Sequence, residues 1–347
     1  MVLNAIDLAR RGHSVRIYDQ HTFGGAWRPY GVGNEYSYDD GVHILYWQKG
    51  LNEKLIRELN DRYELQLVTL NPSPRGDRCI LGFGFPEFSF PVEMHWREIL
   101  RAIKTIVLRI ISGEIKYYYF LHGCFGLQQR LLAVCGKNDI QVITNEKINS
   151  ITKEDDQLLI KSENEVKHFD CALASSRILY NTDLEFTKTS SQILSKKTSG
   201  NEFDVRLKHI FLSVQNPGPV TFSVFKFTGG HPIFAVSDIR CYVSEDYDDY
   251  LKSGERAIYS FAMNPGRLIP SVSDLLSELV ARKLCSPSAT IISHSSKESW
   301  GPNIPESMIR DVNVMGESIL YFYRYDNLSK GLKQHLRRPV WQQLKLA

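Results

Sequence analysis

Residues 8–45 read LARRGHSVRIYDQHTFGGAWRPYGVGNEYSYDDGVHIL. Apolar residues at helical spacing fill the positions before Gly12, and two arginines precede that glycine, as cations often do at the end of a helix. Residues 14–18 then alternate as a short strand that ends on Asp19. A helix, a glycine, a strand and an acid in this order form the second half of a βαβ unit, so we predict an α/β fold.

Asp19 and the glycines after it are candidates for cofactor contacts. An acid at the tip of this strand accepts hydrogen bonds from the ribose hydroxyls of an adenine dinucleotide. Gly24 and Gly25 let the backbone approach a ligand without interference from side chains. Arg28 offers a guanidinium group that can meet a pyrophosphate.

This ordered set resembles the N-terminal FAD-binding segment of the superfamily of flavin amine oxidases, protoporphyrinogen oxidases, phytoene desaturases and UDP-galactopyranose mutases. The shared order is an acid, a short loop, two glycines with a nearby arginine, and later a Gly-x-His, here Gly41-Val42-His43. The resemblance implies FAD as the cofactor and a Rossmann-like FAD-binding domain, incomplete at its N-terminus, with an inserted α+β substrate domain. It implies cofactor contacts by Asp19 (adenosine ribose), by Gly24, Gly25 and Arg28 (pyrophosphate and ring system), and by Gly41 and His43 (isoalloxazine). Trp27 is a further candidate cofactor contact.

Later segments extend the resemblance. In residues 142–151 it implies that the backbone of Ile148 touches adenine, and Ser175 stands at the strand end where the chain enters the substrate domain. Arg324 falls in the run that corresponds to a flavin-contacting Gly-Arg-Tyr turn, although Tyr323 replaces the glycine. His43 is the candidate catalytic residue, and the competing interpretation is a loop histidine that bonds to the backbone.

A glycine-rich Gly-x-Gly-x-x-Gly loop and the strand before it are expected just upstream of Ala5, and the sequence lacks them. This loop supplies backbone N–H groups that neutralise a pyrophosphate. The chain is therefore expected to be N-terminally truncated or degenerate, and Met1 need not be the true start. A non-catalytic remnant that no longer binds FAD tightly is the competing hypothesis.

The pattern of elements suggests a chain that alternates between two domains. We expect helices over 51–64, 95–111 and 273–284, a turn, helix and strand over 123–142, and mostly strands over 205–262. The expected division is 1–50 (FAD-binding domain, first part), 51–120 (helical part of the substrate domain), 121–180 (FAD-binding domain, second part), 181–300 (β-rich substrate domain) and 301–347 (return to the FAD-binding domain and C-terminal tail).

Composition limits the partners. The net charge of +3 and the lack of a dense Lys/Arg tract argue against nucleic acid. The six cysteines are scattered without a metal-binding pattern, and no metal site is expected. No secretory signal or span of roughly 20 apolar residues is visible, so a cytoplasmic protein is expected. The apolar face of 95–111 is expected to pack on a core, and peripheral membrane contact is the alternative.

The function favoured by these observations is an FAD-dependent oxidoreductase that moves a hydride from a small-molecule substrate to flavin N5, provided that the glycine-rich loop exists in the full gene product. A UDP-galactopyranose mutase-like isomerase of a nucleotide sugar is the alternative within the superfamily. The substrate and the oligomeric state stay open, because one fold hosts several of these reactions.

Overall fold

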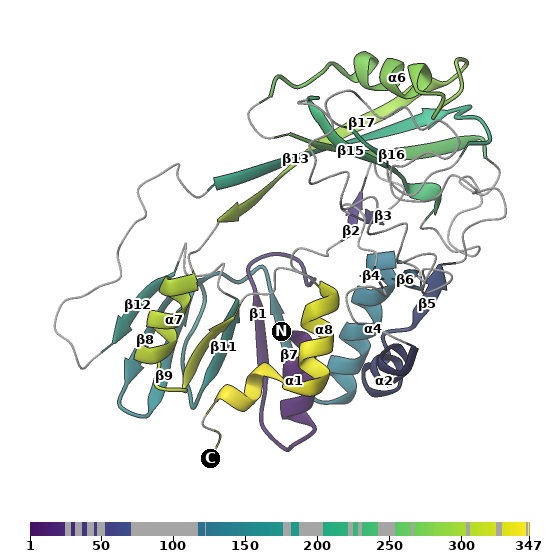
Figure 1. Cartoon of the computed structure of the whole chain (residues 1–347). Coiled ribbons are helices and arrows are strands. Elements are labelled where there is room, and N and C mark those ends of the chain that lie inside the picture. Colours follow the sequence, from purple (N-terminus) through teal and green to yellow (C-terminus); the bar gives the residue numbers. More distant parts are fainter. Residues whose placement is uncertain are drawn as a thin grey trace.

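The computed structural model of the 347-residue chain consists of a lower group of elements, which contains both termini, and an upper β-sheet (Figure 1). The structure describes residues 1–24, 29–31, 37–39, 45–46, 53–70, 117–121, 123–175, 182–186, 204–220, 225–227, 231–241, 254–264, 267–302, 306–323, 328–344 and 346.

The described elements alternate between helices and strands in the lower group and are mostly strands in the upper one (Figure 1). In chain order they are α1 (Val2–Ala9), β1 (Arg16–Asp19), β2 (Pro29–Gly31), β3 (Ser37–Asp39), β4 (Leu45–Tyr46), α2 (Glu53–Tyr63), β5 (Leu67–Leu70), β6 (Tyr117–Phe120), α4 (Gly123–Lys137), β7 (Gln141–Thr144), β8 (Ile148–Glu154), β9 (Gln157–Ser162), β10 (Val166–Phe169), β11 (Ala172–Ser175), β12 (Asp183–Phe186), β13 (Asp204–Gln215), β14 (Phe225–Lys226), β15 (Ile233–Asp238), η4 (Ile239–Cys241), β16 (Arg256–Met263), α6 (Val272–Ala281), β17 (Thr290–Pro302), α7 (Glu306–Met315), β18 (Leu320–Tyr323), α8 (Leu328–Arg337) and η5 (Val340–Gln343).

The opening helix and strand form as predicted. α1 ends before Gly12, whose φ of +90° is a conformation that glycine adopts at little cost, and the chain turns there into β1. Ile6 of α1 and Ile17 of β1 are buried in one core with α2 and α4. Burial of these apolar side chains fixes α1 against β1.

Two parallel ladders carry the strand ends that matter for the site. β1 pairs with β7, so that Asp19 lies opposite Thr144, and β11 pairs with β18, so that Ser175 lies opposite Tyr323. Within the described residues the two ladders form separate two-stranded sheets, which lie near each other in Figure 1. In each ladder the carboxyl ends of both strands meet at one edge, where ligands of α/β proteins commonly bind.

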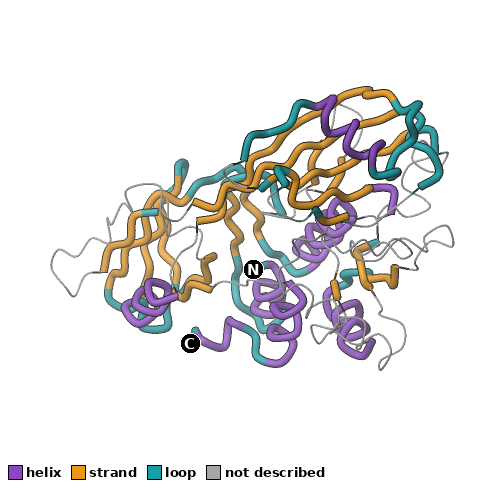
Figure 2. Tube along the Cα trace, turned by 45° about the horizontal axis from the view of Figure 1, so that its top comes forward, coloured by secondary structure: helices purple, strands orange, loops and turns teal. Residues whose placement is uncertain are grey.

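Four further sheets are present among the described residues, and the two smaller ones are a β2-β3 pair and a three-stranded sheet of order β4-β6-β5. β10, β9, β8 and β12 form a sheet in the lower group that shares a core with α7. The upper sheet has the order β14-β15-β16-β13-β17, and α6 lies across one side of it (Figures 1 and 2). The first residues of β13 pair with the end of β17 alone, so these two strands extend from the upper sheet toward the lower group (Figure 1).

The helices expected over 51–64 and 273–284, and the helix and strand expected within 123–142, are confirmed. Phe169 ends β10, and a separate strand, β11, begins at Ala172. Pairing with β13 keeps β17 extended through Pro302. The predicted helix over 95–111 lies outside the described residues. No described helix combines the length and apolar character needed to cross a membrane.

Candidate functional site

The carboxyl end of β1 places Asp19 beside the corner that joins β7 to β8. The N–H of Asn145 donates to the carbonyl of His21 over 3.0 Å, and the N–H of Glu146 donates to the carbonyl of Asp19 over 3.1 Å. The Asp19 Oδ1 atom accepts from the N–H of His21 at 3.1 Å. Among the described residues no donor is shown for Oδ2, so this half-buried carboxylate has an acceptor available for a ligand hydroxyl.

The turn after Asp19 requires glycine. Gly24 has φ of +123°, a conformation that L residues rarely adopt. The preceding Phe23 is 3% exposed, and its carbonyl accepts a hydrogen bond from the side chain of Gln128 on α4. The chain therefore leaves β1 along a fixed path, on which the backbone conformation at position 24 favours a glycine.

Glu146 forms the inner side of the β7–β8 corner. Its side chain is buried, and its carboxylate accepts from the N–H of Asn164 at 2.8 Å and also from the Asn164 side-chain amide. Hydrogen bonds from Ser162 and Asn164 lower the pKa of Glu146. Ile148 follows at the start of β8, where its carbonyl accepts from the Thr182 hydroxyl at 3.0 Å.

A second carboxylate, that of Glu165, anchors the β9–β10 hairpin to β1. It accepts from Arg16 at 3.1 and 3.2 Å, and from the hydroxyl of Tyr18. The hydrogen bond from Tyr18, followed by the bond and charge of Arg16, lowers the pKa of Glu165. Neither Glu146 nor Glu165 was selected from the sequence, although Glu146 lies inside the 142–151 segment that carries part of the resemblance.

The structure describes four of the residues predicted to contact a cofactor, and they lie in two places. Ser175 is half-buried at the carboxyl end of β11. Asp19, Gly24 and Ile148 gather instead around the end of β1 and the β7–β8 corner. The remaining candidates lie outside the described residues: Gly25, Trp27, Arg28, Gly41, His43 and Arg324.

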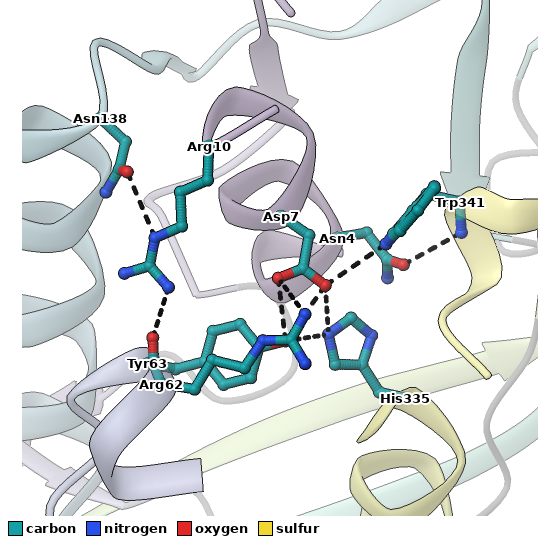
Figure 3. A network of polar contacts seen from close by, with 8 residues as sticks. All are labelled: Asn4, Asp7, Arg10, Arg62, Tyr63, Asn138, His335 and Trp341. Carbon is teal, nitrogen blue, oxygen red and sulfur yellow. Dashed lines mark hydrogen bonds and ion pairs between the residues drawn. The ribbon is translucent and has the colours of Figure 1, made fainter. Parts of the chain in front are cut away.

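A separate polar cluster joins α1 to the C-terminal segment (Figure 3). We call it the hub and define it as Asn4, Asp7, Arg62, Tyr63, His335 and Trp341. The Asp7 carboxylate is its centre. It accepts from Arg62 at 3.0 Å, from the Tyr63 hydroxyl at 3.0 and 3.1 Å, and from the Trp341 indole at 3.3 Å.

The protonation pattern of the hub follows from its donors. His335 Nε2 lies 2.7 Å from the Tyr63 oxygen and 3.3 Å from Asp7 Oδ2. Tyr63 gives its one proton to Asp7, so a proton on His335 Nε2 satisfies both contacts, while no described residue reaches the buried Nδ1. Burial raises the pKa of Asp7, but the hydrogen bond from His335 and the charge of Arg62 outweigh it, and the pKa is lowered overall.

The Asp7 carboxylate of the hub is buried and paired, whereas the Asp19 carboxylate at the end of β1 has one oxygen without a described donor. Asp7, Tyr63 and His335 are at most 3% exposed, and both oxygens of the Asp7 carboxylate accept hydrogen bonds. In the described part of the chain, no group of three or more His, Cys, Asp or Glu side chains is arranged to hold a metal ion. The end of β1, with Asp19, is therefore the candidate ligand site, and the hub is a structural cluster.

No protein-family model and no curated protein matches the sequence. The structure resembles putrescine oxidase bound to putrescine, with a TM-score of 0.60 and 10% identity over 98% of this chain and 95% of that one. It also resembles an Exiguobacterium sp. 255-15 protein assigned as a protoporphyrinogen oxidase (TM-score 0.58, 12% identity, 98% and 95% covered). A third likeness is to PF1083 of Pyrococcus furiosus (TM-score 0.57, 13% identity, 100% and 96% covered). At these identities the likeness shows the fold alone, which is the α/β fold that the chain shares with these proteins.

Proposed function

We propose that this chain binds FAD and acts as an oxidoreductase of the amine oxidase-like type. The observation that carries the proposal is the Asp19 carboxylate at the carboxyl end of β1. One of its oxygens stabilises the local turn, and the other has no donor among the described residues. An acid in this position of a Rossmann-like unit accepts hydrogen bonds from ribose hydroxyls.

The described residues fit the nucleoside end of FAD. Asp19 would hold the ribose, and the backbone of Ile148 would lie beside adenine. Gly24, whose φ of +123° favours glycine, would present no side chain to a passing pyrophosphate. When bound, FAD supplies the hydride acceptor for the reaction. Gly25, Trp27, Arg28, Gly41, Ser175 and Arg324 are proposed as further contacts, and His43 as the residue beside the flavin ring.

The substrate proposed is a small molecule with an oxidisable C–N or C–H bond. Support comes from the fold, which the chain shares with putrescine oxidase and with the protein assigned as a protoporphyrinogen oxidase. A fold alone does not select among amines, porphyrinogens and nucleotide sugars. The mutase-like alternative therefore stays a prediction.

A second candidate is a non-catalytic protein of the same fold. Its supporting observation is that, within the described residues, the β1–β7 and β11–β18 ladders do not share a hydrogen-bonded sheet. A continuous parallel sheet normally holds the pyrophosphate-binding loop at its centre. A chain that lacks this support would keep the fold but bind the dinucleotide weakly.

Reconstitution with FAD separates the two candidates. The purified chain is incubated with FAD, desalted and examined for retained flavin absorption. The oxidoreductase proposal predicts retained flavin, loss of it in Asp19→Ala, and normal retention in Asp156→Ala, which removes an exposed carboxylate from the β8–β9 turn. A colourless wild-type protein after reconstitution would leave the non-catalytic candidate in its place.

A further inference from the structure

A closed loop of polar contacts begins and ends on β1. It runs from Arg16 and Tyr18 to Glu165, passes along the chain to Asn164, crosses to Glu146 and returns to Asp19. We call these six residues the clasp. The last contact reaches Asp19, the residue proposed to bind the ribose. Each step of the clasp therefore affects how Asp19 is held.

The first step fixes the hairpin to β1. Arg16 and Tyr18 are two positions apart on the strand, so their side chains leave the same face. Both donate to the Glu165 carboxylate, and the Tyr18 ring also makes an edge contact with Phe169, with ring centroids 6.2 Å apart. The hairpin is therefore held on β1 by a charged contact and an aromatic one.

The second step makes the tip of the hairpin rigid. The N–H of Ser162 donates to the carbonyl of Glu165 over 2.9 Å, and the N–H of Glu165 donates to the Ser162 hydroxyl over 3.2 Å. The N–H of Glu163 donates to the carbonyl of Lys147 over 3.2 Å. These bonds orient Asn164, which carries the next contact.

The third step connects the hairpin to Asp19. Asn164 donates from its backbone and its side chain to the buried carboxylate of Glu146. A buried carboxylate needs such donors, because an unpaired one is strongly disfavoured. The backbone N–H of Glu146 then holds the carbonyl of Asp19 at 3.1 Å. The orientation of the β7–β8 corner relative to Asp19 thus depends on the Glu146 side chain.

We propose that Glu146 is a positioning residue for the adenosine end of a bound dinucleotide. It acts through Asn164 on one side and through its own backbone on the other, and it sets the distance between Asp19 and the backbone of Ile148. The inference rests on the proposed function, since it assumes that this corner receives an adenosine. A residue that served stability alone would leave the affinity of the folded protein for adenosine nucleotides unchanged.

Binding of ADP to the full-length chain, measured by isothermal titration calorimetry, tests the inference. Glu146→Ala is expected to weaken ADP binding by about tenfold, which corresponds to the loss of one well-placed hydrogen bond. Glu163→Ala is the matched control, because it removes an exposed carboxylate of the same hairpin while its backbone bond remains. Circular dichroism confirms that each variant is folded at the temperature of the titration.

A rescue variant shows whether the hydrogen bonds themselves matter. In Asn164→Asp two carboxylates face each other, and ADP affinity should fall at least as far as in Glu146→Ala. The double variant Glu146→Gln with Asn164→Asp exchanges donor for acceptor and keeps the number of hydrogen bonds. Its ADP affinity should return close to that of the wild type. If Glu146→Ala fails to fold, Asn164→Asp and the double variant still provide the test.

The outcomes distinguish the inference from the function on which it rests. Wild-type ADP binding that Asp19→Ala weakens and Glu146→Ala leaves unchanged would overturn the positioning role alone. A double variant no better than Asn164→Asp would also overturn it. A wild-type chain that binds no ADP would overturn the proposed function and the inference together.

Discussion

The hub and the clasp are both built around carboxylates, but they differ in what their oxygens face. Asp7 of the hub is 3% exposed and surrounded by donors from α2, α8 and η5. In the clasp, each carboxylate oxygen of Glu146 and Glu165 accepts from a protein donor, and Asp19 keeps an oxygen without a described donor. A cluster whose carboxylate oxygens are all paired contributes stability, whereas a cluster with an unpaired oxygen can also bind a ligand.

Removal of the hub's central carboxylate has the largest expected effect. Asp7→Ala leaves the Tyr63 hydroxyl, His335 and the Trp341 indole without their buried acceptor. Each buried donor that is left without an acceptor costs about 1–3 kcal/mol. Urea unfolding should show this loss, and the ADP affinity of the folded fraction should change little.

The control for Asp7→Ala is Asp61→Ala, which removes an exposed carboxylate from α2. It should change the free energy of unfolding by less than about 0.5 kcal/mol. A similarly small loss in Asp7→Ala would mean that the hub is not a stabilising cluster. A large loss of ADP affinity in folded Asp7→Ala would remove the distinction between hub and clasp.

Tyr63→Phe has the next largest effect. The hydroxyl is fully buried with its ring, donates to Asp7 and accepts from His335. Its removal leaves a buried His335 N–H without one acceptor, at a cost of about 1–3 kcal/mol in urea unfolding. Tyr321→Phe, at a half-buried tyrosine of β18, is the matched control, and an equal loss in both variants would argue against the hub.

The two regions also differ in how far the sequence predicted them. The helix, glycine, strand and acid around Gly12 could be predicted because they depend on local periodicity and turn conformation. Asp19 and Gly24 were proposed as contacts from the same local pattern, and their role as cofactor contacts stays a prediction. The hub was not, because Asp7 and His335 are 328 positions apart and each, taken alone, is a polar residue in a short helix.

Pairing partners explain the other differences. β17 contains the polar run Ser293–Ser296, which has little strand character, and becomes a long strand because it pairs with β13 over its full length. Glu146 lay within a recognised segment, yet its role depends on Asn164 at the tip of a hairpin. Such contacts join residues that are distant in the sequence, so they cannot be predicted from the local sequence pattern.

Acid should weaken the hub in a defined direction. The pKa of Asp7 is lowered in the folded chain, so its contribution is present above the unfolded pKa and is lost as the pH falls through the folded one. The stability difference between wild type and Asp7→Asn should therefore be constant near neutrality and shrink below about pH 4. Urea unfolding at several pH values measures it, and a difference that grows in acid would contradict the assignment of a charged Asp7.

The smallest expected effect on stability is that of Glu165→Gln in the clasp. The Arg16 and Glu165 side chains are 20% and 36% exposed, and partly exposed ion pairs contribute about 0.2–1 kcal/mol. The amide still accepts from one donor, so the hairpin should stay docked, and ADP binding should weaken less than in Glu146→Ala. Glu163→Gln supplies the control in the same hairpin. If Glu165→Gln instead destabilised the chain as much as Asp7→Ala, the clasp would be a second structural cluster, and the contrast with the hub would no longer indicate where a ligand binds.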